Sequence, residues 1–453
     1  MTKNPTIKYY PLSSPQQDIW FEQLRYPDVP IYNLGGYLQI NGALEVTVFE
    51  QALNQVIQEQ EALRLSFHPE ATSQTILENV SVSLNYHDFS AQPSAHQVAL
   101  AWMAQEFVKP FQLDQVPLFQ LALCQTSAQC YYWFQKYHHL IVDDWAVSLI
   151  NQRVAEIYNH LVTGKSLAKP NAYSYLAWVE PEQAYFHSEA VAEHERYWLA
   201  QYHSLPEPLI QFRSTVSSPE LSLTSQRTTY LLQPHLYQQL TEFARANNTS
   251  LFHLILSALY GYFVRTHSRT DLVMGLSTSN RNQADFQQVI GCLATVSPVW
   301  LRLGMDLNAM ELLKAIDSEW QDNCKNQPIS LTELNRRLGL PQANRSQLFD
   351  ITLSYVKHSD DIYFHDQPAG WVSLSNGFQT QALVVRVEEF LSSKSVTIHF
   401  DYHLSVFTTE EMELIKARLA FLLSEIIRQP LQLFPVLRAH FFPFFCFQKA
   451  RVV

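Results

Sequence analysis

Glycine, cysteine and basic side chains are all scarce in this sequence. Only 11 of the 453 residues are glycine, and no low-complexity or collagen-like tract is present, which excludes fibrous and repetitive classes. The formal net charge of -11 argues against a nucleic-acid-binding protein, because such proteins neutralise phosphates with lysine and arginine. No apolar run approaches the roughly 18 residues of a spanning helix, and residues 1–10 lack the apolar core of a signal peptide. We therefore expect a cytoplasmic protein that binds neither nucleic acid nor membrane.

Cysteine is present but without any pattern. The five cysteines are odd in number, scattered and never in CxxC spacing: Cys124, Cys130, Cys292, Cys324 and Cys446. This usage predicts free, mostly buried thiols in a reducing compartment and no zinc site.

The sequence is rich in hydrophobic residues, at 47%, and in aromatic residues, at 13%. A chain of this size commonly forms more than one domain. Period-2 and helical patterns alternate in both halves, which predicts an α/β fold with two sandwich lobes, 1–175 and 180–430. Helices are expected at 46–63, 234–246, 250–267 and 410–427, and strands at 118–124, 131–137, 271–276, 296–303, 350–356, 382–388 and 395–402.

Two segments stand apart from this pattern. Residues 164–182 are rich in Lys, Pro, Asn and Tyr and are expected to connect the two lobes. The atypical tail, 431–453, has no period and many phenylalanines. Three explanations remain open for it: a packed strand, a misread frame or a truncated end.

The residues most suited to catalysis lie at the end of the strand expected at 131–137. His138 and His139 follow that strand, and Asp143 and Asp144 precede an apolar helical stripe. Aspartates at that place start helices, because a carboxylate accepts the free first-turn amides. An imidazole there can accept a proton from an attacking amine or alcohol. Taken alone, paired histidines are more often a plain polar strand end than a reaction centre.

Two other kinds of site are disfavoured. Adjacent histidines on a strand point to opposite faces, so His138, His139 and Asp143 do not make a convincing metal site. The run GLSTS at 275–279 begins like the nucleophile elbow of serine hydrolases, but lacks the final glycine of the tight turn.

Several segments in order resemble the motifs of nonribosomal peptide synthetase condensation domains, of the chloramphenicol acetyltransferase-like superfamily. The run HHLIVDD at 138–144 is similar to HHxxxDG in all but the last letter. Segments 12–20, 61–67, 173–178, 271–281, 290–302 and 348–355 are similar to further family motifs, over roughly residues 9–430. One such match is weak evidence, whereas the ordered set is strong evidence.

The resemblance implies two lobes arranged as a V, with a tunnel between them. It implies amide-bond formation between an acyl or peptidyl thioester donor and an aminoacyl acceptor. No cofactor would be bound: both substrates would arrive on the 4'-phosphopantetheine arms of donor and acceptor carrier proteins, and adenylation domains would belong to the same pathway. The stretches 381–387 and 400–402 resemble chain-initiating domains, which take an acyl starter.

Site roles follow from the same resemblance. His139 would accept or position the proton of the amine, and His138 would support the loop. Asp143 would form a structural ion pair with Arg281 across the lobes. Arg64 would hold the tunnel wall or a neighbouring loop.

The chain departs from the family at a few positions. Asp144 stands in place of the motif glycine, Asn280 replaces the glycine before Arg281, and Ser297 lies near the usual asparagine. Asp144 keeps a second hypothesis open, in which the domain is a catalytically silent platform for a carrier protein or tailoring enzyme. If the domain is active, exchange of Asp144 for glycine is expected to be roughly neutral or to improve the rate.

Overall fold

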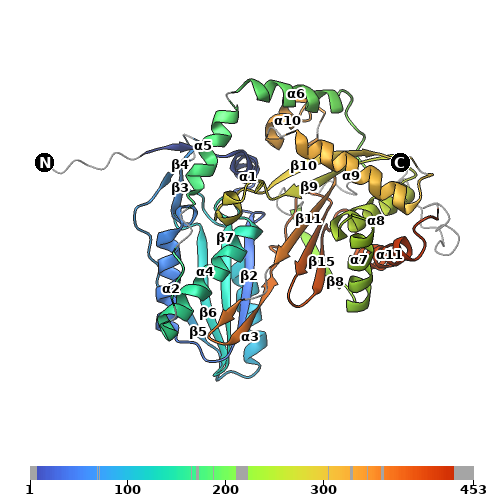
Figure 1. Ribbon diagram of the computed structural model, residues 1–453. Helices are drawn as coiled ribbons and strands as arrows, with labels where there is room; N and C mark the ends of the chain where they lie inside the picture. The colour runs from blue at the N-terminus through green and yellow to red at the C-terminus, as the bar shows by residue number, and fades with distance from the viewer. Residues whose placement is uncertain are drawn as a thin grey trace.

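The computed structural model describes residues 8–68, 70, 72–164, 166–169, 173–186, 188–210, 223–304, 306–326, 330–343, 345–358 and 362–432. Two mixed α/β lobes lie side by side, each built around a six-stranded sheet (Figure 1). The predicted fold class is confirmed.

The first lobe is a sheet with helices on both faces. Its strand order is β12 (Tyr363–Phe364), β13 (Gln367–Ser373), β2 (Asn33–Asn41), β7 (Cys130–His138), β6 (Phe119–Ser127) and β5 (Asn85–Asp88). Helices α2 (Val46–Glu59) and α4 (Asp144–Thr163) pack on the face that contains Trp133, and α3 (Ala95–Phe107) packs on the face that contains Phe134. Successive β7 residues therefore enter different clusters, as strand alternation requires.

The second lobe is a second six-stranded sheet with a separate core, in which its helices pack together on one face. Its strand order is β10 (Thr295–Arg302), β9 (Asp271–Thr278), β11 (Ile351–His358), β14 (Leu383–Phe390), β15 (Ser395–His403) and β8 (Ser225–Leu231). Its packed helices are α7 (Pro234–Ala246), α8 (Leu251–Thr266), α9 (Ala309–Lys325) and α11 (Thr409–Arg428). Helix α8 is buried along most of its length, which explains why its sequence is apolar on nearly every side.

Short elements bridge or border the lobes. They are the small sheet of β1 (Tyr10–Pro11), β4 (Ser73–Ile76) and β3 (Leu65–His68), the turns η1 (Glu61–Arg64) and η4 (Asp285–Gln288), and helices α1 (Ser14–Arg25), α5 (Tyr175–Phe186), α6 (Glu189–Gln201) and α10 (Leu331–Arg337). The predicted connection at 164–182 is thus partly helical, because α5 begins within it. In Figure 1, α5 and α6 lead from the first lobe to the second along the top.

One part of the predicted division needs correction. The second lobe expected at 180–430 includes residues 363–373, but β12 and β13 belong to the sheet of the first lobe, where Trp371 pairs with Leu38 of β2. The edge strand β2 provides the backbone hydrogen bonds that β13 needs. Because β2 lies far from β13 in the sequence, the local pattern of residues 363–373 does not reveal this pairing. The remaining boundaries stay predictions, and 433–453 of the tail lie outside the described residues.

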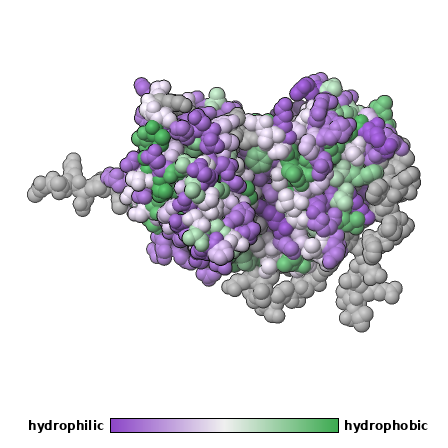
Figure 2. Space-filling view, turned by 90° about the horizontal axis from the view of Figure 1, so that it is seen from below, coloured by the Kyte–Doolittle hydropathy of each residue, from purple (hydrophilic) through white to green (hydrophobic). Residues whose placement is uncertain are grey.

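The described residues also show how the helices, the cysteines and the surface compare with the predictions. None of the helices there combines the length and apolarity needed to cross a membrane. The four cysteines described are free: Cys124 and Cys292 are buried, Cys130 is partly buried and Cys324 is exposed, so burial is less general than predicted. Figure 2 shows two masses that meet along a seam, with hydrophilic side chains in its middle.

Candidate active site

The two histidines lie where β7 ends at the junction of the lobes, and they differ sharply in environment. His138 is buried, whereas His139 keeps part of its surface accessible. The His138 amide donates to the Leu118 carbonyl, and the His139 amide donates to the Tyr32 carbonyl, each over 2.9 Å. The backbone at the end of the strand is therefore held on both sides.

Both ring nitrogens of His138 are engaged in hydrogen bonds. Its Nδ1 accepts the Leu140 amide at 3.2 Å, so its Nε2 carries the proton that is donated to Oε1 of Gln23 at 3.2 Å. Burial, followed by the charge of His139, lowers the pKa of His138 to about 3. The ring is neutral at physiological pH and both nitrogens are occupied.

His139 has the opposite arrangement. Its Nδ1 lies 2.8 Å from the carbonyl oxygen of Val142, which can only accept, so Nδ1 is the protonated nitrogen. Nε2 therefore carries the lone pair. The Sγ atom of Cys292, from the second half of the chain, lies 3.9 Å from Nδ1 on the buried side. His139 has the tautomer and partial exposure that a proton acceptor needs.

Asp143 ties this loop to the second lobe. It caps α4 by accepting the Ala146 amide at 2.9 Å, and it forms a bidentate ion pair with Arg281 at 2.7 and 3.0 Å. The same carboxylate accepts the amides of Leu293 and Ala294, each at 3.0 Å. Burial would raise the pKa of Asp143, but the charge and hydrogen bonds of Arg281, with the backbone amides, hold it below its usual value. The ion pair implied by the resemblance is present.

Arg281 is itself positioned by a residue that departs from the family. Its guanidinium also donates to the carbonyls of Ser279 and Val289, at 3.1 and 3.2 Å. Asn280, immediately before it, has a φ of 52°. Asparagine tolerates this left-handed backbone better than most residues, so it can stand where the family has glycine.

Asp144 makes a second contact between the lobes. Its Oδ1 lies 2.8 Å from Nη1 of Arg386 on β14. One turn along α4, the hydroxyl of Ser148 lies 3.1 Å from Nδ1 of His358 on β11. Asp144 therefore adds no unpaired charge beside His139, because an arginine neutralises it.

Behind Arg386 lies the buried carboxylate of Glu388. It lies 3.2 Å from Nε2 of His399 and 3.9 Å from Nε2 of His358. Burial opposes ionisation, but the hydrogen bond of His399 and the charges of His358, His399 and Arg386 lower the pKa of Glu388 to about 2.

Two other predicted positions, Arg64 and Ser297, have contacts of their own. Arg64 donates to the carbonyls of Leu77 and Glu78, so it holds a neighbouring loop. Ser297 is buried in β10, opposite Leu276 of β9. Sequence reasoning missed Tyr32, Cys292 and Arg386 as neighbours of the site. Cys292 and Arg386 lie within segments that resemble the family, but nothing in those segments marks either residue as a contact, and all three reach the site through tertiary packing.

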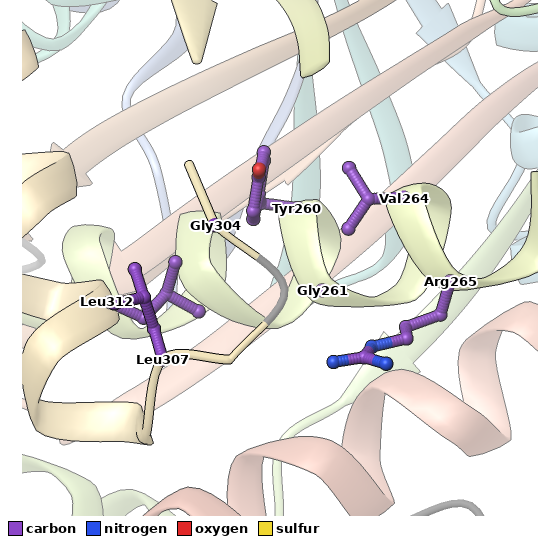
Figure 3. Close-up of a pocket in the computed structure, with 7 residues that line it drawn as sticks. All are labelled: Tyr260, Gly261, Val264, Arg265, Gly304, Leu307 and Leu312. Carbon is purple, nitrogen blue, oxygen red and sulfur yellow. The ribbon is translucent and has the colours of Figure 1, made fainter. Parts of the chain in front are cut away.

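A surface depression lies elsewhere in the second lobe. It is shallow and lies between α8 and the segment leading to α9. Figure 3 shows its lining residues, among them Tyr260, Arg265 and Leu312. The Tyr260 hydroxyl is already bonded to the Leu303 carbonyl at 3.0 Å. The depression contains none of the residues discussed above.

The family profile described as "Condensation domain" matches residues 6–435. The chain belongs to the condensation-domain family. Among curated relatives, it is 28% identical over 416 residues to a dimodular nonribosomal peptide synthase of Bacillus subtilis (strain 168), covering 91% of this condensation domain and 17% of the relative. Surfactin synthase subunit 1 of the same organism is 25% identical over 433 residues, with coverage of 94% and 12%. The domain thus spans less than a fifth of these synthetases.

Solved structures give the same assignment. A variant of the starter condensation domain of rhizomide synthetase, in complex with C8-CoA, matches with a TM-score of 0.85 and 29% identity, covering 94% of this condensation domain and 96% of that chain. The first condensation domain of the calcium-dependent antibiotic synthetase matches with a TM-score of 0.83 but 19% identity, covering 94% and 98%. The second likeness concerns the fold alone.

Proposed function

We propose that this condensation domain forms an amide bond between an acyl thioester donor and the amine of an aminoacyl acceptor, both carried on phosphopantetheine arms. The observation that carries the proposal is the state of His139: Nδ1 is held by the Val142 carbonyl and Nε2 is left as an acceptor. Donor and acceptor carrier proteins are the partners this reaction requires, and adenylation domains would load them.

The chemistry needs one positioned base. The amine nitrogen attacks the thioester carbonyl, a C–N bond forms, and the C–S bond breaks when the tetrahedral intermediate collapses. The proton lost by the amine passes to Nε2 of His139 and then to the departing thiolate. Asp143 is fully engaged by Arg281 and three amides, so its part is to fix the loop that carries His139.

The donor is proposed to be a starter acyl group. This is supported by the 27–29% identity to starter condensation domains of rhizomide synthetase, with TM-scores of 0.78 to 0.85. Because one of them was solved with C8-CoA, a medium-chain acyl thioester is the first donor to test.

The silent platform remains the second candidate, because Asp144 occupies the glycine position. Its contact with Arg386 weakens that candidate, since the paired carboxylate is drawn toward the second lobe. The two candidates make opposite predictions for turnover by the unaltered protein.

The test is transfer of an octanoyl group from a loaded carrier or CoA to an aminoacyl carrier, followed by mass spectrometry. We expect His139→Ala to lower turnover by about 10²- to 10⁴-fold, the usual contribution of a positioned base. Circular dichroism checks the fold.

His235→Ala is the matched control, because His235 is exposed on α7. It should leave turnover unchanged. Full activity in the His139 variant would remove that residue from the mechanism. Absence of turnover in the unaltered protein with several loaded pairs, together with carrier binding, would favour the platform.

A further inference from the structure

Helix α1 presents two carboxylates to the junction of the lobes. Asp18 and Glu22 lie one turn apart, and both are half-buried. Asp18 accepts the amides of Leu331 and Thr332, at 3.1 and 2.8 Å, where α10 of the second half begins. Glu22 accepts a hydrogen bond from the hydroxyl of Tyr32. This face of α1 therefore lies between the lobes, beside the loop that carries the histidines.

Tyr32 connects Glu22 to the candidate catalytic histidine. Its carbonyl accepts the His139 amide at 2.9 Å, and its ring lies edge-on to the His139 ring, with 6.3 Å between ring centroids and 72° between planes. Its hydroxyl ends at the Glu22 carboxylate. Glu22 is thus one tyrosine side chain away from His139.

Glu22 differs from Asp143 and Asp144, which each pair with an arginine. Asp143 pairs with Arg281 and Asp144 pairs with Arg386. In the part of the chain that the structure describes, Glu22 forms no ion pair within 4.0 Å. The nearest arginine in sequence, Arg25, has its guanidinium over the Tyr26 ring, 5.5 Å from the centroid.

Because Glu22 has no counter-ion among the described residues, little opposes the effect of burial on its pKa. It raises the pKa of Glu22, and the hydrogen bonds of Tyr32 and Thr380 and the more distant charge of Arg25 only partly oppose it. Burial and the adjacent Glu22 charge also raise the pKa of Tyr32 well above its usual value, so its hydroxyl remains a donor. A desolvated carboxylate without a counter-ion gains most when a cation arrives.

We propose that Glu22, held by Tyr32, binds the ammonium group of the acceptor beside His139. This inference rests on the proposed function, because only the condensation reaction brings an amine to this junction. An α-amino group has a pKa near 7.7–8.0, so much of the acceptor arrives protonated at neutral pH. The carboxylate pairs with that ammonium, and the Tyr32 ring face offers a cation–π contact. Loss of one proton to solvent releases the nucleophilic amine, and the proton that the amine loses on attacking the thioester passes to Nε2 of His139.

The direct test is binding, which needs no turnover. Isothermal calorimetry compares an aminoacyl N-acetylcysteamine thioester with its N-acetylated form, which carries no ammonium. The unaltered protein should prefer the charged probe. Glu22→Gln keeps the size of the side chain but removes its charge, and should weaken binding of the charged probe by about 10- to 100-fold, the loss expected for one hydrogen bond to a charged group. Binding of the acetylated probe should not change.

Kinetics supply a second readout. Glu22→Gln should raise the KM for the aminoacyl acceptor and leave the KM for the acyl donor unchanged, and Glu22→Asp should recover part of the loss. An aromatic amine acceptor, uncharged at neutral pH, should be used equally well by both proteins. Tyr32→Phe keeps the ring and the backbone bond to His139, and serves if the Glu22 variant folds poorly.

Glu242→Gln, an exposed change on α7, is the matched control. Equal binding of the charged probe by the unaltered protein and Glu22→Gln would overturn the inference, as would an equal loss for both probes. Those results would leave the proposed function standing if transfer still depends on His139. Activity that survives His139→Ala would instead remove His139 from the mechanism, and absence of turnover in the unaltered protein would defeat the proposed function. In both cases the binding result still decides whether Glu22 holds the ammonium.

Discussion

Asp143 and Asp144 are neighbours in the chain, and each pairs with an arginine of the second half. The two ion pairs differ in burial and in the number of hydrogen bonds. The Asp143–Arg281 side chains are 2% and 1% exposed, and the carboxylate accepts five hydrogen bonds. The Asp144–Arg386 side chains are 23% and 20% exposed, and a single bond of 2.8 Å joins them. The same residue types therefore serve different ends.

The first pair is a structural hub, because every lone pair of its carboxylate is used to hold α4 and the segments around 281 and 293 together. The second pair neutralises a charge that the family does not usually carry at this place. A buried pair contributes little net stability against apolar replacements, but loss of one partner is costly. The difference between the pairs should therefore appear when single partners are removed.

The largest effect is expected at the buried pair. Asp143→Ala and Arg281→Ala should each lower the free energy of unfolding by about 3–5 kcal/mol, because each leaves a buried charge alone. The double substitution should cost less than the sum of the two, as contacting residues do. Urea denaturation of all four proteins measures the coupling.

A control cycle uses Asp322 and Lys325 on α9, whose side chains are 57% and 69% exposed. Each single change there should cost less than about 1 kcal/mol. Additive losses at Asp143 and Arg281 would show that they do not interact energetically, and would remove the contrast between the two pairs.

Protonation of Glu388, the buried carboxylate close to Arg386, should cause a loss of stability in acid. The pKa of Glu388 is about 2 in the folded protein, below its ordinary value of 4.5. A carboxyl group with a depressed pKa stabilises the fold above its unfolded pKa, so this contribution is present above pH 4.5 and is lost as the pH falls toward 2. It amounts to on the order of 3 kcal/mol at neutral pH.

Thermal melting between pH 7 and pH 2 follows this loss. Glu388→Gln should be less stable at neutral pH and should show a flatter decline below pH 4.5 than the unaltered protein. An identical acid limb in both proteins would contradict the assignment.

The smallest effect is expected at Asp144. Its exchange for glycine restores the family residue but leaves Arg386 without its partner and removes a carboxylate from the first turn of α4, so we expect a loss of about 1–2 kcal/mol. This loss concerns stability alone, and the expectation of a roughly neutral or improved rate stays a prediction. Turnover should stay within a few-fold, measured with the octanoyl and aminoacyl substrates above. Transfer that appears only in the glycine variant would support the silent platform instead.

Local patterns in the sequence predicted the elements that position the site. The strand expected at 131–137 is β7, and the helix expected after Asp143 is α4 with Asp143 as its cap. These predictions succeeded because strand alternation and capping involve residues close together in the chain. The ordered motifs added the family and the contact between Asp143 and Arg281.

The sequence by itself determined the alternation of strands and helices, the histidine pair at a strand end and the surplus of acidic residues. Only the tertiary structure decided that β13 joins the first sheet, that Arg386 neutralises Asp144, and that Tyr32 and Glu22 lie beside His139. The physical reason is distance along the chain: Arg386 lies far from Asp144 in sequence, and nothing in either local segment specifies the other. Such pairs form only when two separately packed cores bring their edges together.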